Sequence, residues 1–349
     1  MKTLSPGPLA RGTHPPPLMR RGSRLASGLL LGTALDAIVA DPRAAHPVAA
    51  FGSLAARAED RLWAGTRTRG VLFTAACVGP VAAGGWGLQR PARRGSLRGT
   101  GLTAIATWTV LGAASLATEA SGIATALNSG DLDAARQRLP ALCGRDPDQL
   151  DAPGVARATV ESVAENTSDA AVAPLFWGAV AGMPGLLAYR AINTLDAMVG
   201  HHSPRYERFG WAAARLDDIA NWVPARLTAL LTVVLAPAAS GSPRRALRAL
   251  RRDGAAHPSP NAGRCEAAFA GALGVRLGGT NVYQGMAEQR GLLGDGPAPT
   301  ALDISRAVTL SRLVTVAVAV VTAAAAWLLR GGRGRLGSAR RSPGGRRQQ

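Results

Sequence analysis

Long apolar segments separated by polar stretches run along most of the chain, and this pattern predicts membrane helices. The apolar segments cover residues 25–40, 71–88, 101–117, 225–239 and 307–329. A helix needs about 20 mostly apolar residues to cross the hydrocarbon core of a bilayer, so about four or five crossings are expected. If one segment does not cross fully, the two shortest, 25–40 and 225–239, are the first candidates.

Polar and apolar residues are interleaved in the middle of the chain, where a short motif occurs twice. The pattern Asn-Thr-x-Asp-Ala covers residues 166–170 and 193–197, and Gly, Met, Pro and Gly interrupt the apolar segment between them at 182–185. Pro and Gly in succession favour a turn, and the arms 171–181 and 186–192 are too short to cross a bilayer. The pattern predicts a re-entrant helical hairpin that sets the motif copies side by side. The alternative is two unrelated amphipathic helices whose Asn and Asp residues are ordinary caps.

Composition supports a membrane protein. Of the 349 residues, 47% are hydrophobic and only 4% are aromatic, and the mean hydropathy is +0.08, which is unusual for a soluble chain. We therefore predict an all-α fold, a multi-pass integral membrane helical bundle with a re-entrant helical hairpin. The expected domains are a disordered basic extension over 1–24, one membrane-embedded domain over 25–329 and a disordered Arg-rich tail over 330–349.

The formal net charge of +18 comes almost entirely from arginine. Basic residues gather beside apolar segments, at 90–98, 244–252 and 333–347, as in membrane proteins whose basic loops set the orientation. They lack interleaved aromatic residues, which argues against nucleic-acid binding. If five segments cross, the basic C-terminal tail falls opposite the other basic segments, so sidedness stays open. The 3 cysteines are far apart and suggest neither a zinc site nor a disulfide framework.

Three carboxylates before the hairpin are spaced for one helix face. Glu161, Glu165 and Asp169 follow one another at i, i+4 and i+8. Like charges in such a row destabilise a helix unless a cation meets them. Two explanations are open: Mg²⁺, which binds a few carboxylates together with a substrate phosphate, or an arginine from elsewhere in the fold.

Further acidic residues lie within and after the hairpin. Asp196 belongs to the second motif copy, and the next segment predicts an amphipathic helix with Asp217 and Asn221 on one side. Asp218 can pair with Arg215, one helical turn earlier. Asp217 and Asn221 have no such local cation, so they are better candidates for binding a metal ion or a substrate.

Polar residues gather again over residues 257–285. Asn261 resembles the N-cap of a helix, and Glu266 suits the positive end of that helix dipole. Two glycines then predict a flexible loop that presents Asn281 and Tyr283 as donors and acceptors. No Gly-Lys-Ser/Thr sequence is present, so this loop is not a P-loop.

Five segments of the chain carry a resemblance to a known family. They are DPRAAHPV, ESVAENTSDAAVAPLFW, AYRAINTLDAMVG, RYERFGWAAARLDDIANWVPARLT and HPSPNAGRCEAAFAGALGVRLGGTNVYQG. Together, and in this order, they resemble the CobD/CbiB family, the adenosylcobinamide-phosphate synthases of cobalamin biosynthesis. The resemblance runs from about Leu29 to Leu329 and covers neither residues 1–24 nor the Arg-rich tail.

The resemblance implies a multi-pass protein of the cell inner membrane that forms an amide. It would attach aminopropanol, or aminopropanol phosphate, to the free propionate carboxylate of adenosylcobyric acid. A carboxylate does not condense with an amine unaided, so ATP as co-substrate and Mg²⁺ as cofactor are expected, with an acyl phosphate as intermediate. The lipid bilayer is an expected partner, nucleic acid is not, and a partner subunit is left open.

The resemblance also divides the polar residues by expected role. Those expected to hold Mg²⁺ and phosphate in catalysis are Glu165, Asp169, Asp196 and Asp217, of which Glu165, Asp169 and Asp217 are the metal ligands. Those expected to orient the substrates, or to pair with a phosphate or propionate, are Asn166, Asn193, Asn221 and Arg205. Those expected to line the corrinoid side are Glu161, Asn261, Glu266, Asn281 and Tyr283.

Two other functions stay open. The run DDIAN at 217–221 resembles the acid-rich Mg²⁺-diphosphate motifs of membrane prenyltransferases, although a second motif of that form is missing from the chain. A corrinoid-binding transport subunit would need polar residues distributed through its spans. The last apolar segment has only Ser311 and Arg312 near its start and a few threonines.

Overall fold

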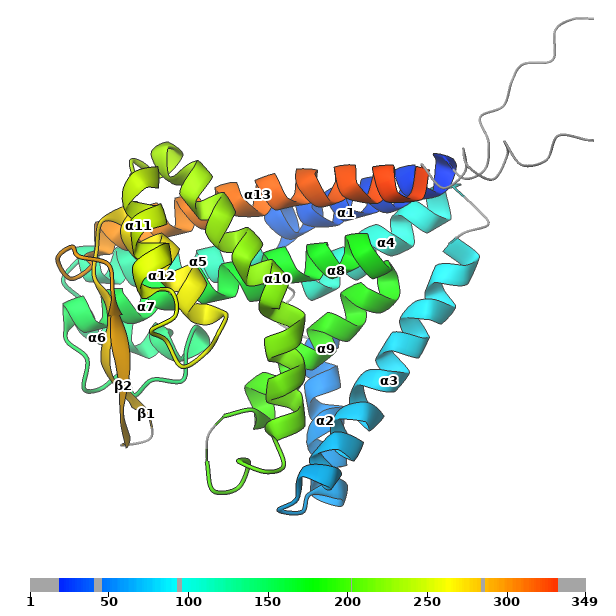
Figure 1. Ribbon diagram of the computed structural model, residues 1–349, viewed down its shortest axis with the longest axis horizontal. Coiled ribbons are helices and arrows are strands. Elements are labelled where there is room, and N and C mark those ends of the chain that lie inside the picture. The colour runs from blue at the N-terminus through cyan, green and yellow to red at the C-terminus, as the bar shows by residue number, and fades with distance from the viewer. Residues whose placement is uncertain (1–18, 41–45, 93–95, 202, 284–285, 332–349) are drawn as a thin grey trace, which may run out of the picture.

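The computed structural model describes residues 19–40, 46–92, 96–201, 203–283 and 286–331. Helices dominate these residues, and a two-stranded antiparallel sheet accompanies them (Figure 1). The all-α prediction is therefore confirmed apart from this small sheet. Of the two ends predicted to be disordered, residues 1–18 and 332–349 lie outside the described part, whereas residues 19–24 belong to the first helix.

Within the described residues, 5 helical stretches are long and apolar enough to cross a membrane, which confirms the multi-pass architecture. They are Gly22–Val39, Arg67–Arg90, Leu97–Asn128, Trp211–Ala239 and Ala301–Leu329. Both of the shortest predicted segments are among them. Large apolar side chains on these stretches, including Leu31, Ile105 and Val320, are exposed. Such surfaces suit contact with lipid rather than water.

Three helices of the membrane part lie side by side: α1 (Met19–Val39), α4 (Ser96–Val110) and α13 (Ala301–Gly331) (Figure 1). Glycines allow their close approach, as small residues commonly do between membrane helices. A Cβ on Gly28 of α1 would lie 2.5 Å from the Cβ of Thr103 on α4. One on Gly22 would lie 2.9 Å from the carbonyl oxygen of Trp327. Because Gly22 is near the start of α1 and Trp327 near the end of α13, these helices run antiparallel.

Helix α3 (Arg67–Ala92) leans against this group, and α2 (Pro47–Leu62) packs beside its first half (Figure 1). The start of α1, the end of α13 and the facing ends of α3 and α4 all lie at the same end of the molecule (Figure 1). Arg24, Arg90 and Arg98 belong to these helix ends. Basic residues from distant parts of the sequence are therefore gathered at one end of the bundle.

The predicted hairpin is confirmed. Its first arm is α8 (Ala173–Ala181) and its second is α9 (Met183–Val199). Gly182 joins them with a φ of 76°, a left-handed conformation that favours glycine. The tip packs against α3, where the backbone N–H of Met183 donates to Gln89 Oε1 at 3.2 Å. The hairpin enters the bundle and returns, as its short arms require.

Helix α10 (Trp211–Leu235) is one continuous helix that passes through Pro224 and joins the predicted amphipathic helix around Asp217 to the start of the apolar segment 225–239. Proline lacks an N–H, so the carbonyl of Ala220, one turn earlier, loses its helical partner. The indole Nε1 of Trp177 on α8 donates to this carbonyl at 2.9 Å. A side chain from the hairpin thus replaces the missing donor, and the helix continues.

The remaining elements form a globular lobe at one end of the bundle (Figure 1). They are α5 (Ala113–Asn128), α6 (Leu132–Arg138), α7 (Ala152–Thr167), α11 (Pro243–Asp253), α12 (Ala262–Leu273), the strands β1 (Leu277–Tyr283) and β2 (Met286–Leu293), and short 3₁₀ turns at Leu139–Ala141 and Ala236–Ala239. Phe269, Leu277 and Leu293 of the lobe share one apolar core with Leu29 and Leu310 of the membrane part. The lobe and the bundle are therefore packed as one body.

The sheet corrects the expectation of a flexible loop around Gly278 and Gly279. Both glycines have positive φ, 79° and 89°, and the strand pairing is irregular there. The guanidinium of Arg157 on α7 donates to the carbonyl oxygens of Gly278 and Thr280. Contacts from a distant helix thus hold this segment in a strand, and the two glycines provide the backbone conformations it needs.

Candidate functional site

The two Asn-Thr-x-Asp-Ala motifs meet at the base of the hairpin, as predicted. The side-chain amide of Asn193, from the second copy, donates to Asp169 Oδ2 of the first copy at 3.2 Å. The same nitrogen lies 3.5 Å from Asp217 Oδ1 on α10. One amide therefore joins two carboxylates that come from different helices. We call Asp169, Asn193, Asp217, Asn221 and Tyr189 the acidic cluster.

The α10 side of the acidic cluster is held by a chain of hydrogen bonds. Asn221 Nδ2 donates to Asp217 Oδ2 at 2.9 Å, and the Tyr189 hydroxyl donates to Asn221 Oδ1 at 2.9 Å. All three residues are buried. Asp217 is thus oriented by two amides before any ligand arrives, which is the preorganisation that binding and catalytic sites require.

Tyr189 is absent from the sequence-based set of site residues. It precedes Asn193 by one helical turn on α9, so both residues lie on the same face of that helix. Only the position of α10 shows that its hydroxyl reaches Asn221. The i, i+4 spacing to a predicted site residue was the available signal.

Asp169 lies in a π-helical turn, Ser168–Val172, between α7 and α8. The prediction that Glu161, Glu165 and Asp169 share one face assumed regular α-helical spacing, which this wider turn interrupts. Asp169 contacts α9, whereas Glu161 pairs with Arg145 inside the lobe. Asp169 and Glu161 therefore have different partners, whereas Glu161 and Glu165 keep their i, i+4 spacing within α7 (Ala152–Thr167).

Glu161 has the arginine that the sequence left as an alternative to Mg²⁺. Its carboxylate forms a buried ion pair with Arg145 and accepts the Gly278 N–H at 2.6 Å. Asn281 is buried next to it, and with its amide oxygen turned to Arg145 it accepts from the guanidinium at 3.1 Å. These residues anchor β1 to α7 and lie apart from the acidic cluster.

Glu165 and Glu266 lie close enough to Glu161 for its charge to act on both. Burial raises the pKa of Glu165, while the positive charges of Arg290 and Arg145 oppose the rise. Glu266 is 1% exposed, and burial followed by repulsion from Glu161 and Glu165 raises its pKa well above the usual range. His257 Nε2 is 3.6 Å from Glu266 Oε1, too far for a hydrogen bond. Glu266 is therefore a buried carboxyl group whose ionisation is opposed by burial and by the charges of Glu161 and Glu165.

The carboxylates of the hairpin repel one another. Burial, and then the charges of Asp217, Glu165 and Asp196, raise the pKa of Asp169 well above its usual range. Burial, and then the charge of Asp217, raise the pKa of Asp196 to about 7. Negative charge is therefore in excess here, and a cation would relieve it.

The donor set fits one way of binding Mg²⁺. Within the described residues, no group of three or more His, Cys, Asp or Glu side chains is arranged to hold a metal ion. Asp169 and Asp217, however, converge on the Asn193 amide. Mg²⁺ commonly uses one or two carboxylates and takes its other ligands from water and substrate phosphate. The residues present fit such a shared site, with Asp169 and Asp217 as the protein's ligands.

Several predicted substrate-binding residues have other partners. Asn166 donates to the backbone oxygen of Ser162 at 3.0 Å. Arg205 bonds Glu59 at 3.0 Å, far from the acidic cluster in the fold, where it ties the loop after α9 to α2. Tyr283 ends β1, and its side chain lies outside the described part of the chain.

Asn261 occupies the N-cap position of α12, but its side chain does not cap the helix. Its amide donates instead to the backbone oxygen of Asp218 at 2.8 Å and so connects α12 to α10. The predicted pairing of Asp218 with Arg215 is confirmed at 3.6 Å.

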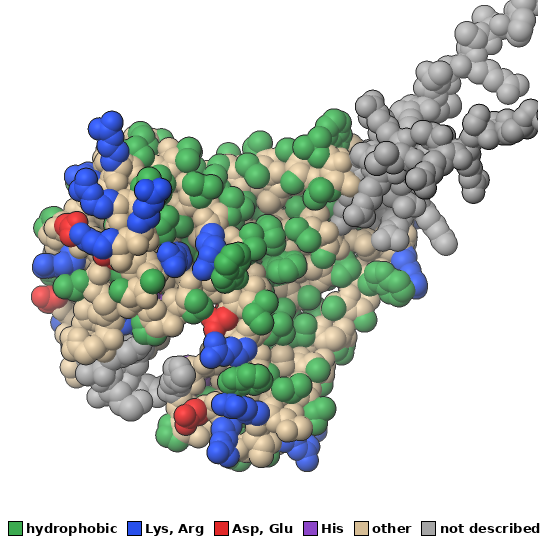
Figure 2. Space-filling view, in the orientation of Figure 1, with side chains coloured by type: hydrophobic (Ala, Val, Ile, Leu, Met, Phe, Trp, Pro, Cys, Tyr) green, Lys and Arg blue, Asp and Glu red, His purple; other side chains and the backbone are tan. Residues whose placement is uncertain are grey.

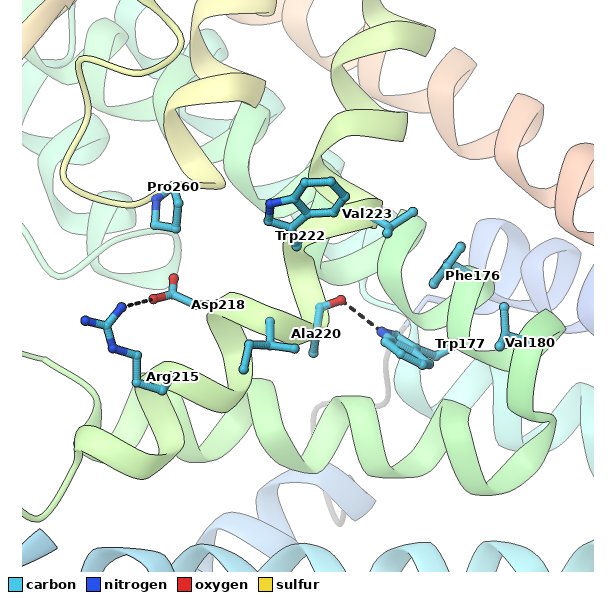
Figure 3. A pocket seen from close by; sticks show the side chains of 10 residues that line it. Phe176, Trp177, Val180, Arg215, Asp218, Ala220, Trp222, Val223 and Pro260 are labelled. Atoms are coloured by element: carbon cyan, nitrogen blue, oxygen red, sulfur yellow. Dashed lines mark hydrogen bonds and ion pairs between the residues drawn. The ribbon is translucent and has the colours of Figure 1, made fainter.

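A cavity lies on the face of α10 that carries Arg215, Asp218 and Ile219, whereas Asp217 faces the acidic cluster. It has a volume of about 570 Å³ and lies between α8, α10 and the turn before α12 (Figure 3). Its lining residues are Phe176, Trp177, Val180, Arg215, Asp218, Ile219, Ala220, Trp222, Val223 and Pro260. Apart from the Arg215–Asp218 pair this lining is apolar and has no group suited to phosphoryl or acyl chemistry. The carboxylates suited to holding Mg²⁺ therefore lie in the acidic cluster and not in the lining of this cavity.

Comparison with known proteins agrees with the sequence resemblance. A family model described as CobD/Cbib protein matches residues 29–311. Cobalamin biosynthesis protein CobD of Mycobacterium tuberculosis is 54% identical over 297 residues, which cover 85% of this chain and 94% of that protein. The proteins of the same name from Geobacter metallireducens and Rhodobacter capsulatus are 48% and 44% identical, covering 78% and 80% of this chain and 87% and 88% of their own lengths. No solved structure matches the chain significantly.

Proposed function

This chain belongs to the CobD/CbiB family of cobalamin biosynthesis proteins, and from that premise we propose that it is an amide ligase of the cell inner membrane. It attaches aminopropanol, or aminopropanol phosphate, to the free propionate carboxylate of adenosylcobyric acid. The product is adenosylcobinamide or its phosphate. The observation that carries the proposal is the convergence of Asp169 and Asp217 on the single amide of Asn193.

The reaction requires an activated carboxyl group. The propionate oxygen attacks the terminal phosphorus of ATP, and ADP leaves with the electron pair of the broken P–O bond. The resulting acyl phosphate is attacked by the amine, an amide C–N bond forms, and inorganic phosphate leaves. Mg²⁺, when bound, supplies positive charge that neutralises the phosphate oxygens. Asp169 and Asp217 hold this charge in place, and Asn193 fixes the two carboxylates relative to each other.

The amine must lose a proton, because an ammonium group has no lone pair with which to attack. Asp196 is our candidate for accepting this proton, since its pKa is about 7 and a base works best near the operating pH. The proton moves from the amine nitrogen to an Asp196 carboxylate oxygen as the C–N bond forms. The burial and neighbouring charges that raise this pKa thus serve the reaction.

Product formation by the purified protein tests the proposal. Detergent-solubilised protein would be given adenosylcobyric acid, aminopropanol phosphate, ATP and Mg²⁺, with mass spectrometry as the readout. We expect a new amide that requires both nucleotide and metal. Asp169→Asn should abolish it, whereas Asp133→Asn, an 83% exposed carboxylate on α6, should not. Retained activity in Asp169→Asn would remove that residue from the mechanism.

The same assay separates the alternatives. Saturable binding of adenosylcobyric acid without product would indicate a corrinoid-binding transport subunit, or a ligase that needs a further subunit. Transfer of a prenyl group from a prenyl diphosphate, with release of diphosphate, would instead indicate a prenyltransferase whose acid-rich motif is 217–221. In the structure only Asp217 of the two adjacent acids in this run faces the acidic cluster, since Asp218 pairs with Arg215 on the outer side of α10.

A further inference from the structure

Two apolar cavities lie on the outer face of α10, one on each side of a ridge formed by Arg215 and Ile219. The cavity of about 570 Å³ lies towards α8, and a second of about 470 Å³ lies towards α3. The second is lined by Val71, Thr74, Ala75, Val78, Gly79, Trp211, Ala212, Arg215, Leu216 and Ile219. Arg215 and Ile219 therefore border both cavities.

The surroundings of both cavities suit the membrane. Helices α3 and α10 are among the stretches apolar enough to cross a bilayer, and Ile219 is 71% exposed. Trp211 and Trp222 lie at the cavities, and tryptophan is enriched where membrane proteins meet the lipid headgroups. Apolar side chains cover much of this face, with a few charged side chains near its middle (Figure 2).

Arg215 of the ridge lies next to a negative group, the carboxylate of Asp218. Arg215 is 65% exposed and its Nη1 lies 3.6 Å from Asp218 Oδ2, while Asp218 is 29% exposed (Figure 3). This distance is longer than a hydrogen bond, so both groups can bind other partners. A guanidinium pairs well with phosphate, and a carboxylate pairs well with an ammonium group.

We propose that the two cavities and the Arg215–Asp218 pair form one binding site for a phospholipid of the phosphatidylethanolamine type. The lipid phosphate lies on Arg215, the headgroup ammonium lies against Asp218, and each cavity takes one acyl chain. This site lies across α10 from the acidic cluster and does not depend on the ligase reaction. It makes the outer face of α10 a lipid-bound surface.

The Asp218 carboxylate selects this headgroup. An ethanolamine ammonium donates hydrogen bonds to a carboxylate, whereas the quaternary nitrogen of choline has no N–H to donate. A phosphatidylglycerol headgroup has no cation, so its net negative charge would meet Asp218 unpaired. The order of retention expected from the structure is therefore ethanolamine first, with choline and glycerol lipids weaker.

Native mass spectrometry of the intact protein tests the headgroup contacts. The delipidated protein would be mixed with equal amounts of phosphatidylethanolamine, phosphatidylcholine and phosphatidylglycerol that carry identical chains. We expect phosphatidylethanolamine to be retained preferentially. Arg215→Gln should lower its retention about tenfold, the effect of losing one charged hydrogen bond. Asp218→Asn should remove the preference among headgroups, whereas Arg248→Gln and Asp133→Asn, on exposed faces of α11 and α6, should leave retention and preference unchanged.

A glycine pair on α3 tests the acyl chains. Gly79 lines the second cavity and Gly87 does not, and a Cβ added at either position meets no atom within 4 Å. Since the first carbon of a side chain fits at both positions, Gly79→Leu should extend into the cavity and reduce retention, while Gly87→Leu should not. Equal retention of the three lipids by the wild-type protein, or equal retention by the two leucine variants, would overturn the proposal.

Discussion

The adjacent residues Asp217 and Asp218 lie on different faces of helix α10 and have different partners. Asp217 is 9% exposed and is bonded by the amides of Asn193 and Asn221, while Asp218 pairs with Arg215 beside an apolar cavity. Successive residues of a helix point in different directions, so neighbouring carboxylates can serve unrelated sites. The surroundings supplied by the hairpin, and not the residue type, make the inner face suited to chemistry.

The comparison is most sharply tested by Asp217→Asn. This change keeps the size of the side chain but removes one of the two charges that face the Asn193 amide. We expect the rate of amide formation to fall by at least about 100-fold, as when one electrostatic group is removed from a catalytic site. Phosphatidylethanolamine retention should stay at the wild-type level, because the outer face is untouched. Loss of both properties together would show that the two faces are one site.

Tyr189→Phe should have the next largest effect. It removes the hydroxyl that donates to Asn221 and so loosens the chain of bonds that orients Asp217. We expect amide formation to fall about tenfold, with a loss of about 1 kcal/mol in the free energy of unfolding. Steady-state kinetics and denaturant unfolding would measure the two. A full loss of activity would place Tyr189 in contact with substrate rather than behind Asp217.

Trp177→Phe tests how the hairpin is fastened to α10. The Ala220 carbonyl loses its donor while Pro224 still cannot replace it, so unfolding should become easier by about 1–2 kcal/mol. In a Pro224→Ala background the helix can supply its own N–H to Ala220. A double-mutant cycle should therefore show a smaller cost for Trp177→Phe there. Equal costs in both backgrounds would contradict the role assigned to the indole.

The pH dependence of unfolding should show the smallest effect. Asp196 has a pKa of about 7 in the folded protein, compared with about 3.9 when unfolded. Between these values the folded state binds more protons, so the stabilisation is present at acidic pH and is lost as the pH rises through about 7. Without ligands, the unfolding temperature should fall by a few degrees between about pH 5 and 8. Asp196→Asn should show a smaller fall, and an identical fall would exclude Asp196 as its source.

Local sequence signals were sufficient for the hairpin and for the meeting of its two motifs. Gly182, within the predicted turn at 182–185, separates the two arms, and Asn193 and Asp169 then have to lie side by side because the arms are short. The Arg215–Asp218 pair also follows from spacing alone. Each of these depends on residues close together in the chain or on a repeat that marks its own partner.

Contacts between segments that are far apart in the sequence could not be predicted. The pairing of Glu161 with Arg145, the strand at Gly278 and the hydroxyl of Tyr189 all depend on how separate elements pack. The missing N–H of Pro224 is visible in the sequence, whereas the indole that donates to the Ala220 carbonyl in its place comes from another helix. The sequence around a residue shows which chemical group it carries, but it does not show which distant residue that group contacts.

The shared end of α1 and α13 constrains how the chain is inserted. The described chain from α1 to α13 starts and finishes at one end of the bundle, so an even number of complete passages fits this arrangement and five complete passages do not. The stretch over α10 runs across the direction of α1, α4 and α13 (Figure 1), and it carries the acidic cluster on one face. Reporter domains fused to the two termini should therefore be accessible from the same compartment. An even number of passages brings Arg24 of α1, Arg90 of α3 and Arg98 of α4 to one membrane surface, as expected for basic residues that set the orientation of a membrane protein.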